Sequence, residues 1–198
     1  WIPFLYPPGY AATVATLGGV VGLGFSVGRA VAAGGTLLAA ACLAGIVGRH
    51  GRGEWAWRWG VGACVAVVFL GTYRASGAFM DLGRPDGLAL GLLALALLLG
   101  LERGRRFVVA SGLVLALAFT VKQHSALWGL PLLLAVVRRE GWREGAVFAA
   151  ASAVPALAFV AAMQGLTAGN FWRYVVEVPA SHPLVWYRAF PGVPWEVG

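Results

Sequence analysis

Residues 101–143, LERGRRFVVASGLVLALAFTVKQHSALWGLPLLLAVVRREGWR, decide how the chain folds. Two arginine-rich runs, ERGRR and RREGWR, flank a long apolar stretch that carries Lys122 near its centre. One continuous membrane helix would place these runs on opposite sides of the membrane, whereas short cytoplasmic loops collect lysine and arginine together. The stretch therefore predicts two crossings, 107–121 and 123–137, which bring both runs to the same side.

The two predicted crossings are short. Each has about 15 residues and spans about 22 Å at 1.5 Å per residue, whereas the hydrocarbon core of a bilayer is about 30 Å thick. We therefore expect the turn that carries Lys122 to lie below the outer surface, or the bilayer to thin there. Polar backbone at that depth must be buried in protein or line a wet cavity. The turn thus predicts an outward-facing polar cavity.

The composition is that of a membrane protein. The chain has 198 residues, of which 60% are hydrophobic and 12% are charged, and its mean hydropathy is +0.78. Soluble domains are about 45–50% apolar and about 25% charged. We predict an all-α polytopic membrane helix bundle with about six transmembrane helices and additional juxtamembrane helices on the outer face. Cys42 and Cys64 lie in apolar stretches and indicate neither a disulfide nor a metal site.

Arginines follow every second apolar segment and set the predicted orientation. The seven segments are 10–28, 30–48, 57–73, 87–101, 107–121, 123–137 and 145–163. The clusters after the second, fourth and sixth segments contain Arg49, Arg52, Arg58, Arg103, Arg105, Arg106, Arg138, Arg139 and Arg143. We place all three clusters in the cytoplasm. This orientation accounts for the net charge of +7, so no nucleic-acid partner is expected.

This orientation predicts transmembrane helices within 30–163 and an external aromatic-rich segment at 164–198. Residues 1–28 form an outer loop with a juxtamembrane helix if the helix at 10–28 does not cross the membrane. The helix at 10–28 either lies along the outer face or crosses the membrane, because its residues are small and apolar on every side.

Lys122 and its polar neighbours are the candidate binding residues. Charged groups inside membrane segments are costly and indicate function, and a lysine suits an anionic oxygen such as a phosphate. The stretch FMDLGRPDGLAL contains Asp81, Arg84 and Asp86 and has two interpretations. In one, an aspartate caps the following helix and an aspartate and the arginine form a local ion pair. In the other, Arg84 faces a phosphate and a carboxylate faces a polar substrate. His124 and His182 are too far apart in sequence to indicate a metal site and are typical of interfacial hydrogen bonding. The residues alone predict a multispan protein with an outward anion-binding cavity.

Five stretches in order carry a resemblance to a known family. They are YPPGY, GFSVGRAVAAGGTLLAAACLAGIVGR, GAFMDLGRPDGLALGLLALALLL, LALAFTVKQHSALWGLPLLL and GNFWRYVVEVPASHPL. Together they resemble the C-type membrane glycosyltransferases that use lipid-linked sugars, and most closely the branch of protein O-mannosyltransferases and lipid A aminoarabinose transferase. The similarity covers nearly the whole chain. It implies a helix along the outer face at 10–28 and an integral, multi-pass protein of the plasma (inner) membrane whose active site faces the periplasm.

The resemblance also implies a reaction and roles for residues. A hexosyl- or pentosyltransferase of this kind moves a sugar from a polyprenyl-phosphate donor to a hydroxyl of a lipid, glycan or protein acceptor. Lys122 and Arg84 would bind the donor phosphate, and the substrate contacts would come from Asp81, Asp86, Tyr6, His124 and His182. The catalytic acidic residue is expected upstream of Trp1, and a C-terminal periplasmic domain is expected beyond the chain. The resemblance leaves the sugar, the acceptor and a requirement for a divalent metal open.

Two other functions remain alternatives at this point. A transporter or flippase of a lipid or polar solute would use the same charged cavity for passage, and an inverted internal repeat would favour it. A noncatalytic assembly subunit would use the charges as interfacial pairs.

Overall fold

The structure, a computed structural model, describes residues 6–73, 75 and 82–181. These residues contain helices and no β-strand, which confirms the all-α prediction. The elements are α1 (Gly9–Val21), α2 (Phe25–His50), α3 (Trp55–Gly71), α4 (Pro85–Leu101), α5 (Arg105–Val121), η1 (Gln123–Trp128), α6 (Gly129–Glu140), α7 (Trp142–Leu166), α8 (Asn170–Trp172), η2 (Arg173–Glu177) and α9 (Val178–Ala180). Here η1 is a 3₁₀-helix and η2 a π-helix.

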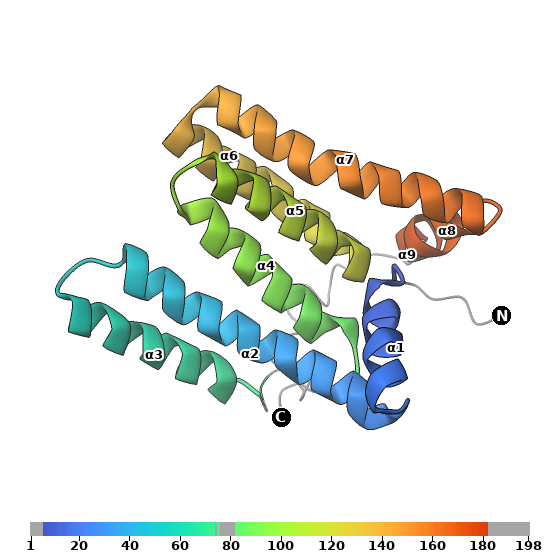
Figure 1. Ribbon diagram of the computed structural model, residues 1–198, viewed down its shortest axis with the longest axis horizontal. Coiled ribbons are helices and arrows are strands. Elements are labelled where there is room, and N and C mark those ends of the chain that lie inside the picture. The colour runs from blue at the N-terminus through green and yellow to red at the C-terminus, as the bar shows by residue number, and fades with distance from the viewer. Residues whose placement is uncertain (1–5, 74, 76–81, 182–198) are drawn as a thin grey trace.

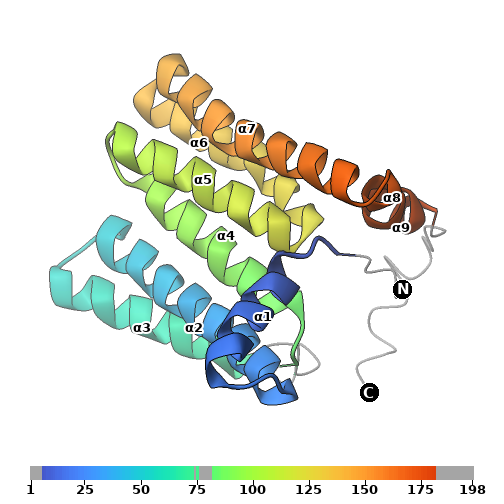
Figure 2. The same cartoon turned by 45° about the vertical axis from the view of Figure 1, so that its right-hand side comes forward.

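The helices α2 to α7 lie side by side and alternate in direction (Figure 1). The α2–α3, α4–α5 and α6–α7 connections therefore meet at one end of the bundle, which we call the arginine end (residues 49–58, 101–106 and 138–143). The start of α4, the Lys122 turn and the end of α7 meet at the opposite, lysine end. Helix α1 lies across the lysine end, and α8 and α9 follow α7 there (Figure 2).

Lys122 separates two antiparallel helices, as predicted for residues 107–137. Its backbone is extended (φ −150°, ψ 117°), and the α5 hydrogen-bonding pattern ends there. The second half begins as a 3₁₀-helix, and its α-helix starts only at Gly129. Pro131 favours this late start, because a proline has no N–H to donate to the carbonyl four residues earlier and is best tolerated in the first turn of a helix.

The predicted boundary between the first two segments is wrong. The helix expected at 10–28 ends at Val21, and the next helix begins at Phe25 rather than at 30. Gly22 makes the turn with φ 93°, a conformation that glycine adopts without steric cost. Its N–H donates to the carbonyl of Gly18 at 2.8 Å. Because the residues around this turn are uniformly apolar, the hydrophobicity of the sequence does not indicate where it lies.

Helices α2 and α4 make a close contact through glycines. A Cβ atom on Gly87 would lie 2.3 Å from the carbonyl oxygen of Ala32, and one on Gly91 would lie 2.4 Å from that of Gly35. Small residues allow membrane helices to approach closely in this way. This contact fixes the start of α4, and with it Asp86, against α2.

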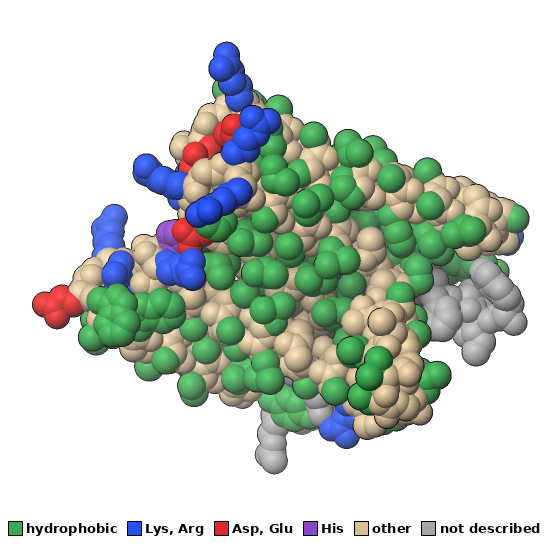
Figure 3. All heavy atoms as spheres, viewed as in Figure 1, with side chains coloured by type: hydrophobic (Ala, Val, Ile, Leu, Met, Phe, Trp, Pro, Cys, Tyr) green, Lys and Arg blue, Asp and Glu red, His purple; other side chains and the backbone are tan. Residues whose placement is uncertain are grey.

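The outer surface of the bundle is apolar. Helices α2 and α7 are long and apolar enough to cross a membrane, and α3 and α4 are shorter apolar helices of 17 residues. Val154, Leu157 and Leu166 on α7 are exposed, and hydrophobic side chains cover the flank of the bundle between its ends (Figure 3). An exposed apolar surface of this extent is typical of a face in contact with lipid.

Candidate functional site

An ion pair between two helices marks the lysine end. Nζ of Lys122 donates to Oδ1 of Asp86, which is the second residue of α4. Both side chains are mostly buried, with 24% of Lys122 and 34% of Asp86 exposed. The pair joins residues 36 positions apart in the sequence. The sequence did not indicate this pair.

The local sequence holds each partner in place. Pro85 is the first residue of α4, where the absence of an N–H is harmless, and Asp86 in the first turn is stabilised by the helix dipole. On the other side, the N–H of Lys122 donates to the carbonyl of Ala118 at 2.9 Å, and its own carbonyl accepts from the N–H of Ser125 at 3.0 Å. The turn is therefore fixed at both its entry and its exit.

Tyr6 covers the ammonium group. The Nζ atom of Lys122 lies 5.6 Å from the centroid of the Tyr6 ring, within the range of a cation–π interaction. The start of α1 is anchored beside it, because the hydroxyl of Tyr10 donates to the carbonyl of Gly28 at 2.7 Å. Gly9 also packs against Thr120 at the end of α5. The structure thus brings Tyr6, Asp86 and Lys122 together.

A cavity of about 610 Å³ opens next to this group. Its walls come from the start of α1, the residues before α4, and the segment from α7 to η2. They consist of Tyr6, Pro7, Pro8, Tyr10, Ala11, Gly83, Pro85, Met163, Thr167, Phe171, Tyr174 and Val175. We call it the tyrosine cavity. The lining is mostly apolar and aromatic, with hydroxyl groups from three tyrosines and one threonine, and so is less polar than expected.

A second cavity of about 390 Å³ lies on the other side of η2. Phe171 and Val175 line both cavities and form the wall between them. The other residues of the second cavity are Phe119, Gln123, His124, Val160, Trp172, Val176 and Pro179. Nε2 of Gln123 donates to the carbonyl of Val175 at 3.1 Å. This hydrogen bond connects the Lys122 turn to the π-helix, a rare element that is frequently found at functional sites.

The remaining predicted site residues are more scattered. Arg84 is exposed immediately before α4, and its neighbours Gly83 and Pro85 line the tyrosine cavity. His124 is exposed and lines the second cavity instead. Asp81 and His182 lie outside the described residues. No group of three histidine, cysteine or acidic side chains is placed to hold a metal ion in the part of the chain that the structure describes.

Three cavity residues carried little signal in the sequence. Tyr10 and Tyr174 belong to segments rich in aromatic residues, where an interfacial position explains them equally well. Gln123 is next to Lys122, but sequence proximity does not reveal its hydrogen bond to Val175, which is 52 residues away. Its position beside the lysine was the one available clue.

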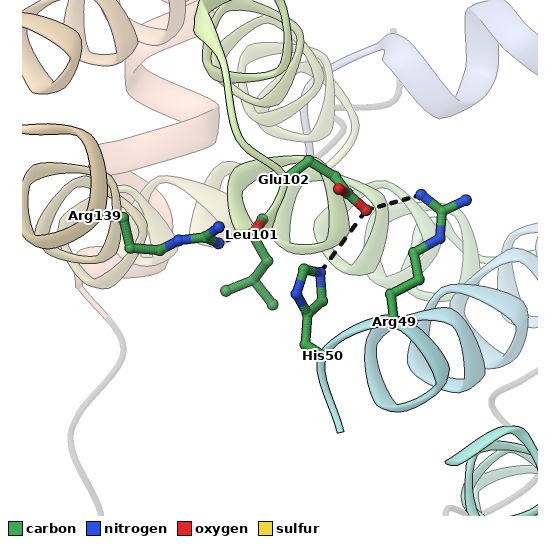
Figure 4. A network of polar contacts seen from close by, with 5 residues as sticks. All are labelled: Arg49, His50, Leu101, Glu102 and Arg139. Carbon is green, nitrogen blue, oxygen red and sulfur yellow. Dashed lines mark hydrogen bonds and ion pairs between the residues drawn. The ribbon is translucent and has the colours of Figure 1, made fainter. Parts of the chain in front are cut away.

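The opposite end is held by a network around Glu102 (Figure 4). Oε1 of Glu102 accepts from Arg49 at 2.8 Å and lies 3.8 Å from Nε2 of His50. Arg139 donates to the carbonyl of Leu101. The hydrogen bond from Arg49 lowers the pKa of Glu102, and the positive charges of Arg49, His50 and Arg139 act in the same direction against partial burial. The network joins the ends of α2, α4 and α6.

The sequence matches glycosyltransferase family 87 over residues 4–187. The chain belongs to this family. No curated protein and no solved structure matches it. Membership of family 87 confirms the prediction of a membrane glycosyltransferase and favours an enzyme over a transporter or an assembly subunit. Its substrates, in general terms, are therefore a sugar donor and an acceptor that receives the sugar.

Proposed function

We propose that this family 87 glycosyltransferase transfers a sugar from a polyprenyl-phosphate donor to an acceptor hydroxyl at the lysine end. The observation that carries the proposal is the mostly buried Lys122–Asp86 pair beside the tyrosine cavity. Charged side chains inside a membrane protein are costly and indicate a functional site. The resemblance to C-type enzymes of the protein O-mannosyltransferase and aminoarabinose transferase branch supports the choice of donor.

The reaction needs a cation where Lys122 lies. The acceptor oxygen forms a bond to the anomeric carbon while the bond from that carbon to the phosphate oxygen breaks, and the acceptor proton passes to a base. The departing polyprenyl phosphate gains one negative charge. A fixed ammonium group next to the leaving oxygen stabilises this charge as it develops. Lys122 has three N–H donors, so it can contact the phosphate without leaving Asp86.

Asp86 prepares the site for both substrates. Without a donor it neutralises Lys122, which keeps the ammonium group at the turn and directed away from lipid. A carboxylate accepts hydrogen bonds at both oxygens, so Oδ2 can accept from a sugar hydroxyl while Oδ1 stays with Lys122. Asp86 thus binds the sugar and positions the cation. Asp81 and His182 are further candidates for substrate contacts.

The tyrosine cavity suits the sugar. Its volume of about 610 Å³ lies within the range of about 300–1,000 Å³ found for small-molecule sites. The rings of Tyr6, Tyr10 and Tyr174 offer flat apolar faces to the C–H groups of a sugar, and their hydroxyls can hydrogen-bond its oxygens. Arg84, at the edge of the cavity, would add a second positive charge for the donor phosphate. His124 would contact substrate from the second cavity.

The orientation follows from the arginine end. Nine arginines gather there, and such residues accumulate in cytoplasmic loops. The lysine end then faces the periplasm of a multi-pass protein of the inner membrane. In this orientation α1 lies along the outer face, and the six bundle helices cross the bilayer.

A transfer assay with two donors tests the proposal. The full-length protein is reconstituted into vesicles with an acceptor glycolipid and a labelled sugar, supplied either as the polyprenyl phosphate or as the nucleotide diphosphate. We expect label to reach the acceptor only from the polyprenyl phosphate. Transfer from the nucleotide donor alone would refute the proposal. In right-side-out vesicles, an impermeant thiol reagent should modify a cysteine at position 122 but not one at position 104; the reverse pattern would refute the orientation.

A further inference from the structure

Five arginines at the arginine end form an exposed basic surface. They are Arg103, Arg105, Arg106, Arg138 and Arg143, from the neighbouring α4–α5 and α6–α7 connections, and we call them the arginine patch. Basic side chains gather at this end in the space-filling view (Figure 3). Within the described ranges, none of the five lies within ion-pair distance of an acidic side chain. All five side chains are exposed, and the guanidinium carbon of Arg106 lies 4.7 Å from the centroid of the Phe107 ring.

The polar contacts around Glu102 fix the relative positions of the loops that carry the arginine patch. Arg49 is bound to Glu102 and Arg139 to the carbonyl of Leu101. These contacts hold the ends of α2, α4 and α6 together and place the loops that carry the patch side by side. The patch is therefore preformed, and a partner does not have to bring the arginines together against their mutual repulsion.

Exposed tryptophans accompany the patch. Trp142, which precedes Arg143, is 79% exposed, and Trp55 and Trp57 at the start of α3 are 68% and 69% exposed. Indole rings prefer the level of the lipid headgroups, where one part of the ring is in an apolar environment and the N–H is hydrated. A soluble anion would not explain why three exposed tryptophans occur at the same end of the bundle as the arginines. A lipid headgroup explains both features.

We propose that the arginine patch binds the headgroup phosphates of acidic phospholipids and selects them over zwitterionic phospholipids. Guanidinium groups match phosphate oxygens with two parallel hydrogen bonds. A zwitterionic headgroup carries its own cation, which the patch repels, whereas an acidic headgroup has a net negative charge. The attraction acts within about one Debye length, roughly 8–10 Å at ordinary ionic strength, so lipids next to this end are the ones selected. This inference does not depend on the sugar chemistry.

Lipid competition measured by native mass spectrometry tests the inference. The full-length protein in detergent is mixed with equal amounts of phosphatidylglycerol and phosphatidylcholine that have the same acyl chains. We expect the wild type to retain phosphatidylglycerol at least about five-fold over phosphatidylcholine. The double variant Arg105→Gln/Arg106→Gln should lose most of this preference. The matched variant Arg29→Gln/Arg173→Gln removes two exposed charges at the lysine end, near the start of α2 and at the start of η2, and should retain the preference.

Two further measurements distinguish lipid binding from a structural role of the arginines and from binding of free phosphate. Arg105→Lys/Arg106→Lys keeps the charges and should keep more than half of the preference, so a loss equal to that of the glutamine variant would point to a structural role. Inorganic phosphate added at constant ionic strength should not displace phosphatidylglycerol, because it has no apolar part to contact the exposed tryptophans at this end. Equal retention of both lipids by the wild type, or an equal loss in the lysine-end variant, would overturn the inference.

Discussion

The two ends of the bundle use charge in different ways. At the arginine end, most charged side chains are exposed, and their charges act together on the surroundings of the protein. At the lysine end, one ammonium and one carboxylate are mostly removed from water, covered by a tyrosine ring and placed next to two cavities. Electrostatic interactions strengthen as water is excluded. Under the proposed function, the comparison teaches that the burial of both partners of an ion pair, rather than the number of charges, distinguishes the proposed chemical site.

The sharpest test of this difference is to remove one charge at each end. Lys122→Met keeps the length of the side chain but removes the cation, and we expect kcat/KM for sugar transfer to fall by about 100- to 1,000-fold, the usual cost of losing one donor to a developing charge. Arg52→Gln, an exposed change at the arginine end, should leave kcat/KM within about two-fold of the wild type. Steady-state assays in one membrane composition provide the measurement.

The outcome is informative in either direction. If Lys122→Met turns over normally while its folded fraction is unchanged by circular dichroism, Lys122 has no part in the chemistry. If both variants lose activity equally, the two ends are not functionally distinct.

Close packing offers the second comparison, with one glycine near each end. Gly87→Ala would place a methyl group 2.3 Å from the backbone oxygen of Ala32, and Gly48→Ala would place one 2.5 Å from the ring of Trp59. We expect each to cost about 1–3 kcal/mol of stability by overpacking. Only Gly87→Ala should also lower kcat, because it displaces the start of α4 and Asp86.

Thermal unfolding in detergent and steady-state kinetics measure the two effects. Gly34→Ala is the matched control, since a Cβ atom there meets nothing within 4 Å. Loss of kcat in Gly48→Ala as large as in Gly87→Ala would contradict the assignment of Asp86 to the site.

The sequence predicted the arrangement of the helices better than the contacts at the candidate site. Arginine spacing and the length of the apolar run were sufficient to infer the break at Lys122, because both reflect the energetics of crossing a bilayer. The pairing of Lys122 with Asp86 was missed, since no periodic pattern couples residues on different helices. The end of α1 at Val21 was also missed, because the turn depends on the backbone freedom of Gly22 within a uniformly apolar stretch.

A third comparison concerns two side chains that each bind a backbone carbonyl. Gln123 reaches Val175 at the lysine end, and Arg139 reaches Leu101 at the arginine end. We expect Gln123→Leu to release the wall between the two cavities and to lower kcat/KM by about ten-fold, equivalent to the roughly 1.4 kcal/mol of one hydrogen bond. Gln123→Glu, which keeps an acceptor but loses the amide donor, should behave like Gln123→Leu. Arg139→Gln should change the melting temperature slightly and leave the kinetic constants unchanged; a ten-fold loss there would contradict the comparison.

The smallest expected effect is the acid sensitivity of the arginine end. Because Arg49 lowers the pKa of Glu102 in the folded protein, the ionised carboxylate stabilises the fold above its unfolded pKa of about 4.5, and this contribution is lost as the pH falls through the lower folded value. Arg49 is more than half exposed, so the contribution is limited to about 0.5–1 kcal/mol. Melting temperatures between pH 7 and pH 3 should therefore fall slightly more steeply for the wild type than for Glu102→Gln. Glu54→Gln, an exposed change in the α2–α3 connection, should follow the wild type, and parallel curves for all three proteins would show that the network adds no stability at this end.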